Sequence, residues 1–108
     1  MTPLRLYLLQ RISAAILAPL VLVHLALIIV AVQGGLTAGE ILGRTQGSTG
    51  WMLLYGLFVV AAAVHGTIGL RTILAELTPW RGRLMDAGVG LFGLLLLALG
   101  LRAVAAVT

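Results

Sequence analysis

The sequence predicts an all-α integral membrane protein with three transmembrane helices that run up, down and up. Apolar residues make up 61% of its 108 residues and charged residues only 9%, whereas soluble domains are about a quarter charged because they need a wetted surface. Three long stretches contain no arginine, lysine, aspartate or glutamate, at residues 12–32, 47–70 and 87–101. The seven arginines lie near the ends of these stretches, where lipid-facing helices place their charges.

Each uncharged stretch is expected to form one membrane-spanning helix. About 20 apolar residues cross a hydrocarbon core of about 30 Å, and lipid offers no hydrogen-bond partner to bare backbone. We expect the helices at residues 6–32, 48–75 and 84–106, in one transmembrane anchor domain over residues 1–108. The third helix continues past Arg102 if that side chain reaches the interface, which is common near a helix end. Its glycines predict a packing seam, because they lie roughly on one face: Gly90, Gly93 and Gly100.

The placement of arginine predicts the orientation in the membrane. With three spans, the N-terminus and the connection between the second and third helices share one side of the bilayer. That side has five of the seven arginines, namely Arg5, Arg11, Arg71, Arg81 and Arg83. The positive-inside rule therefore places the N-terminus in the cytoplasm. Because arginine without lysine is typical of high-GC bacterial coding, we expect a multi-pass protein of a bacterial inner membrane.

Composition excludes several classes of function. A net charge of +4 would suggest nucleic-acid binding in a soluble chain, but here the arginines flank apolar stretches, so no nucleic-acid partner is expected. The chain has no cysteine, which removes disulfides, zinc sites and ligands for iron–sulfur clusters. Any redox chemistry must use histidine or the centres of a partner.

Two histidines, His24 and His65, lie inside the apolar stretches. Ionisable residues at membrane depth are rare and usually functional, and imidazole is the usual axial ligand of a b-type haem. The alternative interpretation is a neutral histidine that hydrogen-bonds to a neighbouring helix.

The surroundings of His65 favour a haem site. Gly69 follows four residues later on the same helix face, where the missing side chain leaves room for a flat macrocycle. Arg71 lies less than two turns away and could contact a propionate. The alternative is that Gly66 and Gly69 only permit close helix packing.

His24 is a candidate second ligand or a neighbour of the haem. It lies about 18 Å deep if the first helix enters the membrane at Ile12. His65 lies about 9 Å deep if its helix leaves at Arg71, or about 16 Å if the helix stays embedded to Glu76. Only the second case gives two heights compatible with one iron, and the sequence leaves both cases open.

The segment from His65 to Glu76, HGTIGLRTILAE, resembles a motif of the cytochrome b anchor subunits of succinate dehydrogenase and fumarate reductase. In that family a histidine ligates haem b, a glycine follows four residues later, and an acid closes the segment. The stretch from Gln10 to Ser13, QRIS, is similar to the family's arginine-plus-hydroxyl signature at the quinone end. The three-span topology agrees with the family as well.

The resemblance implies a role for each matching position. His65 would be the axial ligand of haem b, Arg71 would serve the propionates or the quinone site, and Glu76 would be the closing acid near quinone. Arg11 would lie near the quinone head group with Ser13 as a hydrogen-bond partner.

One position departs from the family pattern. Family members often follow the closing acid with a tyrosine that contacts quinone, and this chain has Leu77 there. Tyr7 is the expected substitute, because it lies four residues before Arg11 on the same face.

The resemblance also implies partners and a function. The partners would be a flavoprotein, an iron–sulfur subunit, and a second small anchor chain, or another copy of this one, that supplies the second haem ligand. The chain would be a non-catalytic anchor of succinate dehydrogenase, complex II of the tricarboxylic acid cycle, and would pass electrons to membrane quinone. Two alternatives are a haem-free structural anchor and a small transporter subunit that uses the histidines as proton relays.

Overall fold

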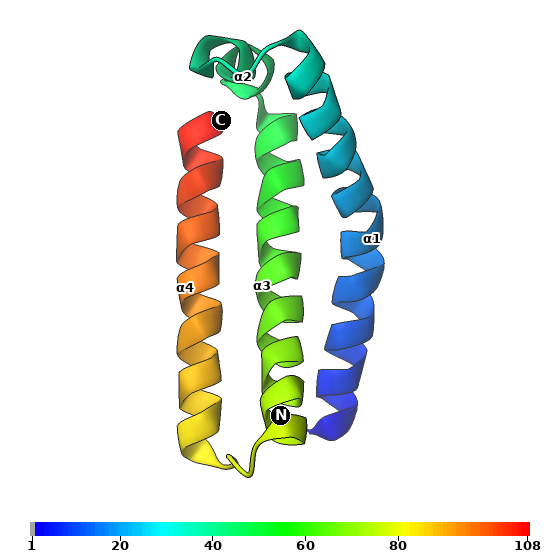
Figure 1. Cartoon of the computed structure of the whole chain (residues 1–108), viewed down its shortest axis with the longest axis vertical. Helices are drawn as coiled ribbons and strands as arrows, with labels where there is room; N and C mark the ends of the chain where they lie inside the picture. The colour runs from blue at the N-terminus through cyan, green and yellow to red at the C-terminus, as the bar shows by residue number, and fades with distance from the viewer. Residues whose placement is uncertain (1) are drawn as a thin grey trace.

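The structure is a computed structural model that describes residues 2–108, and within them the chain forms four α-helices (Figure 1). They are α1 (Pro3–Gly34), α2 (Ala38–Thr45), α3 (Thr49–Leu77) and α4 (Arg83–Val107). Three of them, α1, α3 and α4, are long and apolar enough to cross a membrane, which confirms the predicted all-α fold with three spans. The helix α1 begins at the same end of the bundle as the α3–α4 connection, and the C-terminus lies at the opposite end (Figure 1).

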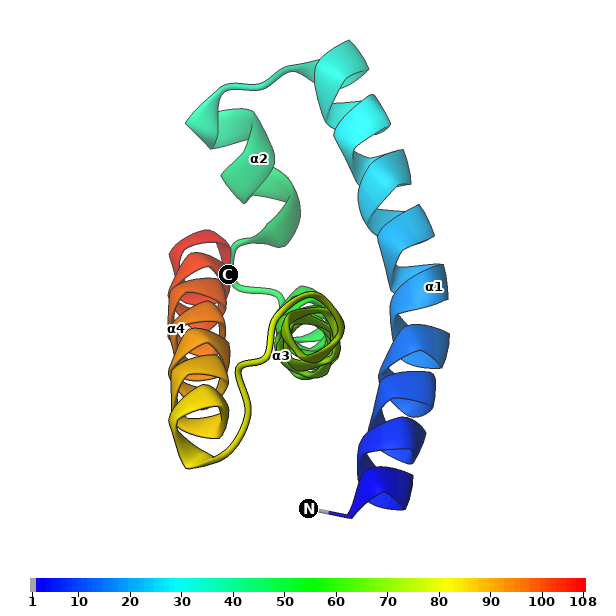
Figure 2. The same cartoon turned by 60° about the horizontal axis from the view of Figure 1, so that its bottom comes forward.

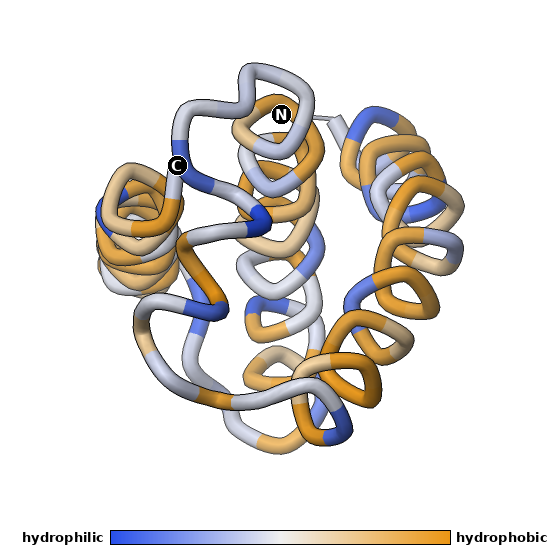
Figure 3. The backbone as a smooth tube through the Cα atoms, turned by 90° about the horizontal axis from the view of Figure 1, so that it is seen from above, coloured by the Kyte–Doolittle hydropathy of each residue, from blue (hydrophilic) through white to orange (hydrophobic). Residues whose placement is uncertain are grey.

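The central helix is α3, and α1 and α4 pack against different sides of it (Figure 2). These two outer helices make no extensive contact with each other. Few apolar side chains are buried as a result, and they are Leu20, Ala61, Ala63, Met85, Val89 and Val104. Hydrophobic residues run along the length of the three long helices (Figure 3). Many of their large side chains are exposed, as a surrounding of lipid or partner helices requires.

Two glycines of α4 let it approach α3 closely. A Cβ at Gly93 would collide with the side chain of Thr67, and a Cβ at Gly100 would collide with Val59. The predicted packing seam is therefore correct at these two positions. Gly90 does not belong to it, because nothing lies within 4 Å of the position that its Cβ would take.

The connector between the first two spans contains the short helix α2, which lies outside the three helices expected from the sequence. Thr37 caps its start by accepting a hydrogen bond from a backbone N–H one turn later. At its end, the hydroxyl of Thr45 donates to the carbonyl of Val107 at 2.6 Å. The N–H of Gly47 donates to the carbonyl of Thr108 at 3.0 Å. These bonds satisfy carbonyls that the last turn of α4 leaves free.

The α3–α4 connector is held by an arginine and a tryptophan. The guanidinium of Arg81 donates to the carbonyls of Ala75, Thr78 and Trp80, so a cation satisfies the free carbonyls at the end of α3. The indole of Trp80 lies over Gly88, where a Cβ would come within 3.3 Å of the ring. This end of the bundle is therefore closed by side chains of the connector itself.

Candidate functional site

The two helices α1 and α3 bring Ser13 and His65 together near the middle of the spans. The Ser13 hydroxyl lies 3.3 Å from Nδ1 of His65 and donates to the backbone carbonyl of Gln10 at 3.0 Å. Ser13 is buried, with 4% of its surface exposed, whereas His65 is half-buried. One imidazole edge is thus held by α1, and no hydrogen bond engages Nε2 within residues 2–108.

Gln10 fills the space next to this pair. Its side-chain nitrogen would lie 3.5 Å from a Cβ at Gly69, so the room that Gly69 leaves is taken by an amide of α1 in this structure. The amide oxygen of Gln10 is buried and has no hydrogen-bond partner among the described residues. Buried polar atoms of this kind are uncommon and mark places where a further polar group fits. An amide can present either its oxygen or its NH₂ to such a group.

The donor set fits one axial position of a haem iron. A neutral imidazole bound through one nitrogen to a hydroxyl keeps its other nitrogen for a metal. The described residues contain no group of three or more histidine, cysteine, aspartate or glutamate side chains that could hold a bare metal ion. A single imidazole instead suits a metal that brings its other ligands with it, as haem iron does.

His24 lies in a separate aromatic cluster. Its ring meets Phe58 edge-on, with centroids 5.2 Å apart, and Tyr55 with centroids 6.5 Å apart. Tyr55 in turn stacks on Trp51 at 5.6 Å. A cavity of about 280 Å³ adjoins the cluster and is also lined by Arg44. His24 itself is exposed, so its ring faces the surroundings of the bundle on one side and aromatic rings on the other.

The two histidines lie at different levels of the bundle. His65 is level with Ser13, and the α1 segment from Ser13 to His24 rises about 16 Å at about 1.5 Å per residue. Two axial ligands of one iron need the same level. The difference in level therefore argues against the expectation that His24 and His65 of one chain bind the same haem iron. His24 stays a candidate neighbour of that haem or a candidate ligand of another one.

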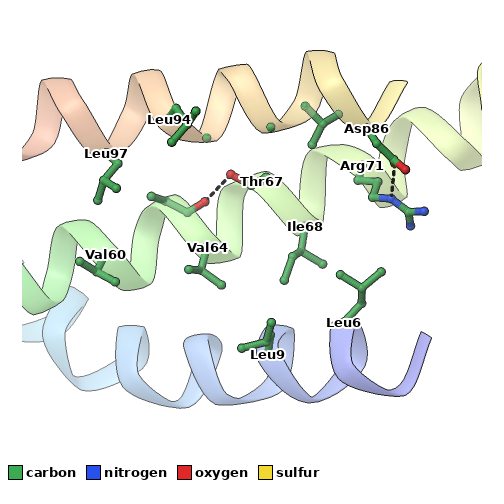
Figure 4. Close-up of a pocket in the computed structure, with 14 residues that line it drawn as sticks. Leu6, Leu9, Val60, Val64, Thr67, Ile68, Arg71, Asp86, Leu94 and Leu97 are labelled. Carbon is green, nitrogen blue, oxygen red and sulfur yellow. Dashed lines mark hydrogen bonds and ion pairs between the residues drawn. The ribbon is translucent and has the colours of Figure 1, made fainter. Parts of the chain in front are cut away.

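Arg71 faces α4 and not the His65 side of α3. Its Nε donates to the carboxylate of Asp86 at 3.1 Å. The pair lies at one end of a cleft of about 530 Å³ between the three long helices (Figure 4). Val60 and Leu97 lie toward the other end of this mostly apolar cleft (Figure 4), and its described lining does not include His65. The expected contact of Arg71 with a propionate of a His65-bound haem is not supported by this arrangement.

The predicted quinone residues are divided between two faces of α1. Ser13 faces α3, whereas Arg11 is exposed and lies about 200° away around the helix, at about 100° per residue. Tyr7 shares the outer face with Arg11 and is 60% exposed. Glu76 is exposed in the last turn of α3, at the same end of the bundle. Tyr7 and Arg11 are therefore brought together as expected, and Ser13 is not part of their group.

A scan against protein-family models matched residues 2–107 to the succinate dehydrogenase/fumarate reductase transmembrane subunit. The chain belongs to this family. The match covers the whole described chain apart from its last residue, and it confirms the resemblance predicted from the His65 segment. Searches of curated proteins and of solved structures returned no match. Membership makes the chain a membrane anchor that associates with the other subunits of its complex, and it favours the anchor interpretation over a transporter.

The sequence did not predict the contacts that two residues of this anchor make. Gln10 contributes both the carbonyl that binds Ser13 and the unpaired amide, and its signal was its position three residues before a buried serine on the same face. Asp86 binds Arg71 across the α3–α4 connection. The signal for that pair was an acid in the first turn of one helix beside a cation near the end of the previous one.

Proposed function

We propose that this chain is the haem b-binding membrane anchor of a succinate:quinone oxidoreductase of a bacterial inner membrane. The observation that supports it is the arrangement of His65, with Nδ1 on the buried Ser13 hydroxyl and Nε2 left for a metal. The buried, unpaired amide oxygen of Gln10 supports a polar guest at this interface, because simple packing would favour an apolar side chain there.

In this proposal His65 supplies one axial ligand through Nε2. A haem b bound there would hold one electron between the iron–sulfur partner and the quinone. The second ligand comes from a second anchor chain or another copy of this one, because His24 of the same chain lies about 16 Å away along the helix axis. The half-buried position of His65 is consistent with a ring shared between two chains.

The quinone binds at the outer face of α1, where Tyr7 and Arg11 are exposed one turn apart. A guanidinium donates strong hydrogen bonds to a carbonyl oxygen that gains negative charge during reduction, and the phenol of Tyr7 can donate a second one. Reduction to quinol takes up two electrons and two protons. Glu76 is the proposed proton relay, since Asp86 is already paired with Arg71. A partner subunit has to cover this face to exclude lipid and water.

A haem-free anchor is the second candidate, and two observations favour it. His65 already has a hydrogen-bond partner in the chain, and the amide of Gln10 occupies the space beside Gly69. Both features would also be found in an interface where the histidine serves only to join α1 to α3.

A difference spectrum of the purified complex separates the two candidates. We expect dithionite-reduced minus oxidised spectra to show a b-type signal that His65→Ala abolishes and His24→Ala retains. Both variants should still co-purify with the flavoprotein and the iron–sulfur subunit, which shows that the anchor has assembled. A wild-type complex without a b-type signal would establish the haem-free anchor instead. A b-type signal that survives His65→Ala would show that other residues hold the haem and would overturn the role of His65.

A further inference from the structure

The hydroxyl of Ser13 has one proton and two polar neighbours. It donates that proton to the carbonyl of Gln10, which in a helix is the common backward bond of a serine to the preceding turn. Its contact with Nδ1 of His65 must then use a lone pair of the oxygen. In that case Nδ1 has to be the nitrogen that bears the ring proton, because a hydrogen bond needs one donor.

The position of that proton decides which nitrogen of His65 can bind a metal. A neutral imidazole with its proton on Nδ1 has its lone pair on Nε2. Without a hydrogen-bond acceptor at Nδ1, the ring could adopt the other tautomer, in which Nε2 bears the proton and has no lone pair for a metal. The Ser13 contact therefore selects the metal-binding form of the ring before any metal arrives.

The same contact fixes the direction of the ring. Ser13 is buried in the α1–α3 interface with 4% exposure, so its oxygen has little freedom to move. The carbonyl, hydroxyl and imidazole form a chain of hydrogen bonds whose members polarise one another. A bond accepted from Nδ1–H also increases the electron donation of the ring to a metal on Nε2.

We propose that Ser13 is the positioning residue of the haem ligand and not a quinone contact: it accepts the Nδ1–H of His65, sets the ring tautomer, and lowers the potential of the haem iron. The tautomer part stands on the hydrogen bonds of this chain alone, whereas the effect on iron rests on the proposed function.

The tautomer is measured on the full chain without haem. We expect the ¹⁵N shifts of His65, in histidine-labelled chain in lipid nanodiscs, to show a protonated Nδ1 and an unprotonated Nε2. Ser13→Ala should move the proton toward Nε2, and Ser13→Thr, which keeps a hydroxyl, should restore the wild-type pattern. His24 is an internal control, because it contacts aromatic rings and should not change. A wild-type His65 protonated on Nε2 overturns the proposal without relying on any variant.

The effect on the metal is measured on the assembled complex. Ser13→Ala should raise the midpoint potential of the haem and weaken its retention by roughly 10- to 100-fold, the usual cost of losing a partner of a metal ligand. Ser13→Thr should stay near wild type. Haem that is present with an unchanged potential and retention in Ser13→Ala overturns the metal part while the proposed function stands. A wild-type complex without haem overturns both the proposed function and the metal part, and leaves the tautomer result to be judged on its own.

Discussion

Single polar side chains decide what each face of α1 can do. Ser13 and Gln10 face α3 and take part in the environment of His65, whereas Tyr7 and Arg11 lie on the outer face. Haem ligation and quinone binding would therefore use opposite sides of one helix. This separation lets the quinone face meet a partner subunit without disturbing the interface that holds His65.

The pair of Arg71 and Asp86 should contribute little to stability. Their side chains are 40% and 57% exposed, and ion pairs open to solvent are screened and typically contribute about 0–1 kcal/mol. We expect a double-mutant cycle of Arg71→Gln and Asp86→Asn, measured by unfolding in bicelles, to give a coupling energy below about 1 kcal/mol. A coupling of about 3 kcal/mol or more, the size of effect found for buried pairs, would contradict this prediction and show that the pair is shielded from solvent in the folded chain.

Part of the arrangement of these side chains could be predicted from the sequence, and part could not. Ser13 and Arg11 lie two positions apart, and helical geometry alone prevents such residues from sharing a face; the sequence could have separated them. The face that His65 shares with Ser13 depends on the rotation of α3 against α1, which near-uniform apolar sequence does not specify. The pairing of Arg71 with Asp86 similarly depends on how the α3–α4 connection turns.

At the scale of elements, hydropathy predicts the three membrane-spanning helices, whereas the short helix α2 depends on capping residues. The three spans begin and end within three residues of the expected bounds, because the length of an apolar stretch is set by the thickness of the bilayer. The helix α2 has no such signal. It depends on the cap at Thr37 and on Glu40 three residues later, a spacing typical of a capping box, inside a connector that is rich in glycine.

The seam between α3 and α4 should tolerate no side chain at Gly93. A Cβ there would overlap the side chain of Thr67, which is itself tied to the carbonyl of Ala63 and cannot turn away without losing that bond. We expect Gly93→Ala to destabilise the chain by about 1–3 kcal/mol, the usual cost of overpacking. The measurement is thermal unfolding of the purified chain in bicelles.

Gly90→Ala is the matched control for this seam. Gly90 lies on the same helix less than one turn away, but nothing lies within 4 Å of its Cβ position. Its substitution should be neutral or slightly stabilising, because alanine is the better helix former. Equal losses at the two positions would mean that the helix–helix contact is not the cause of the effect at Gly93.

At the scale of the whole molecule, the outer helices α1 and α4 both pack on α3 and make no extensive contact with each other (Figure 2). Large apolar side chains such as Leu22, Leu53 and Leu91 remain exposed and need lipid or partner chains around them. The candidate haem ligand His65 is only half-buried. A second anchor chain that packs against it would complete the proposed haem site. The proposed function and the exposed apolar surface therefore both require partner chains.

The orientation of the bundle connects its charges to its proposed function. The end of the bundle where α1 begins and α3 is connected to α4 has five of the seven arginines, and the positive-inside rule predicts that this end lies in the cytoplasm. Tyr7, Arg11 and Glu76 lie toward the same end, so the proposed quinone face would be next to a cytoplasmic iron–sulfur partner. We expect alkaline phosphatase fused after Thr108 to be active and a fluorescent protein fused there to remain dark. Fusions in the α3–α4 connector should give the opposite result. An active phosphatase in the connector would place the quinone face on the far side of the membrane from its electron donor, and electron delivery from a cytoplasmic partner would then be excluded.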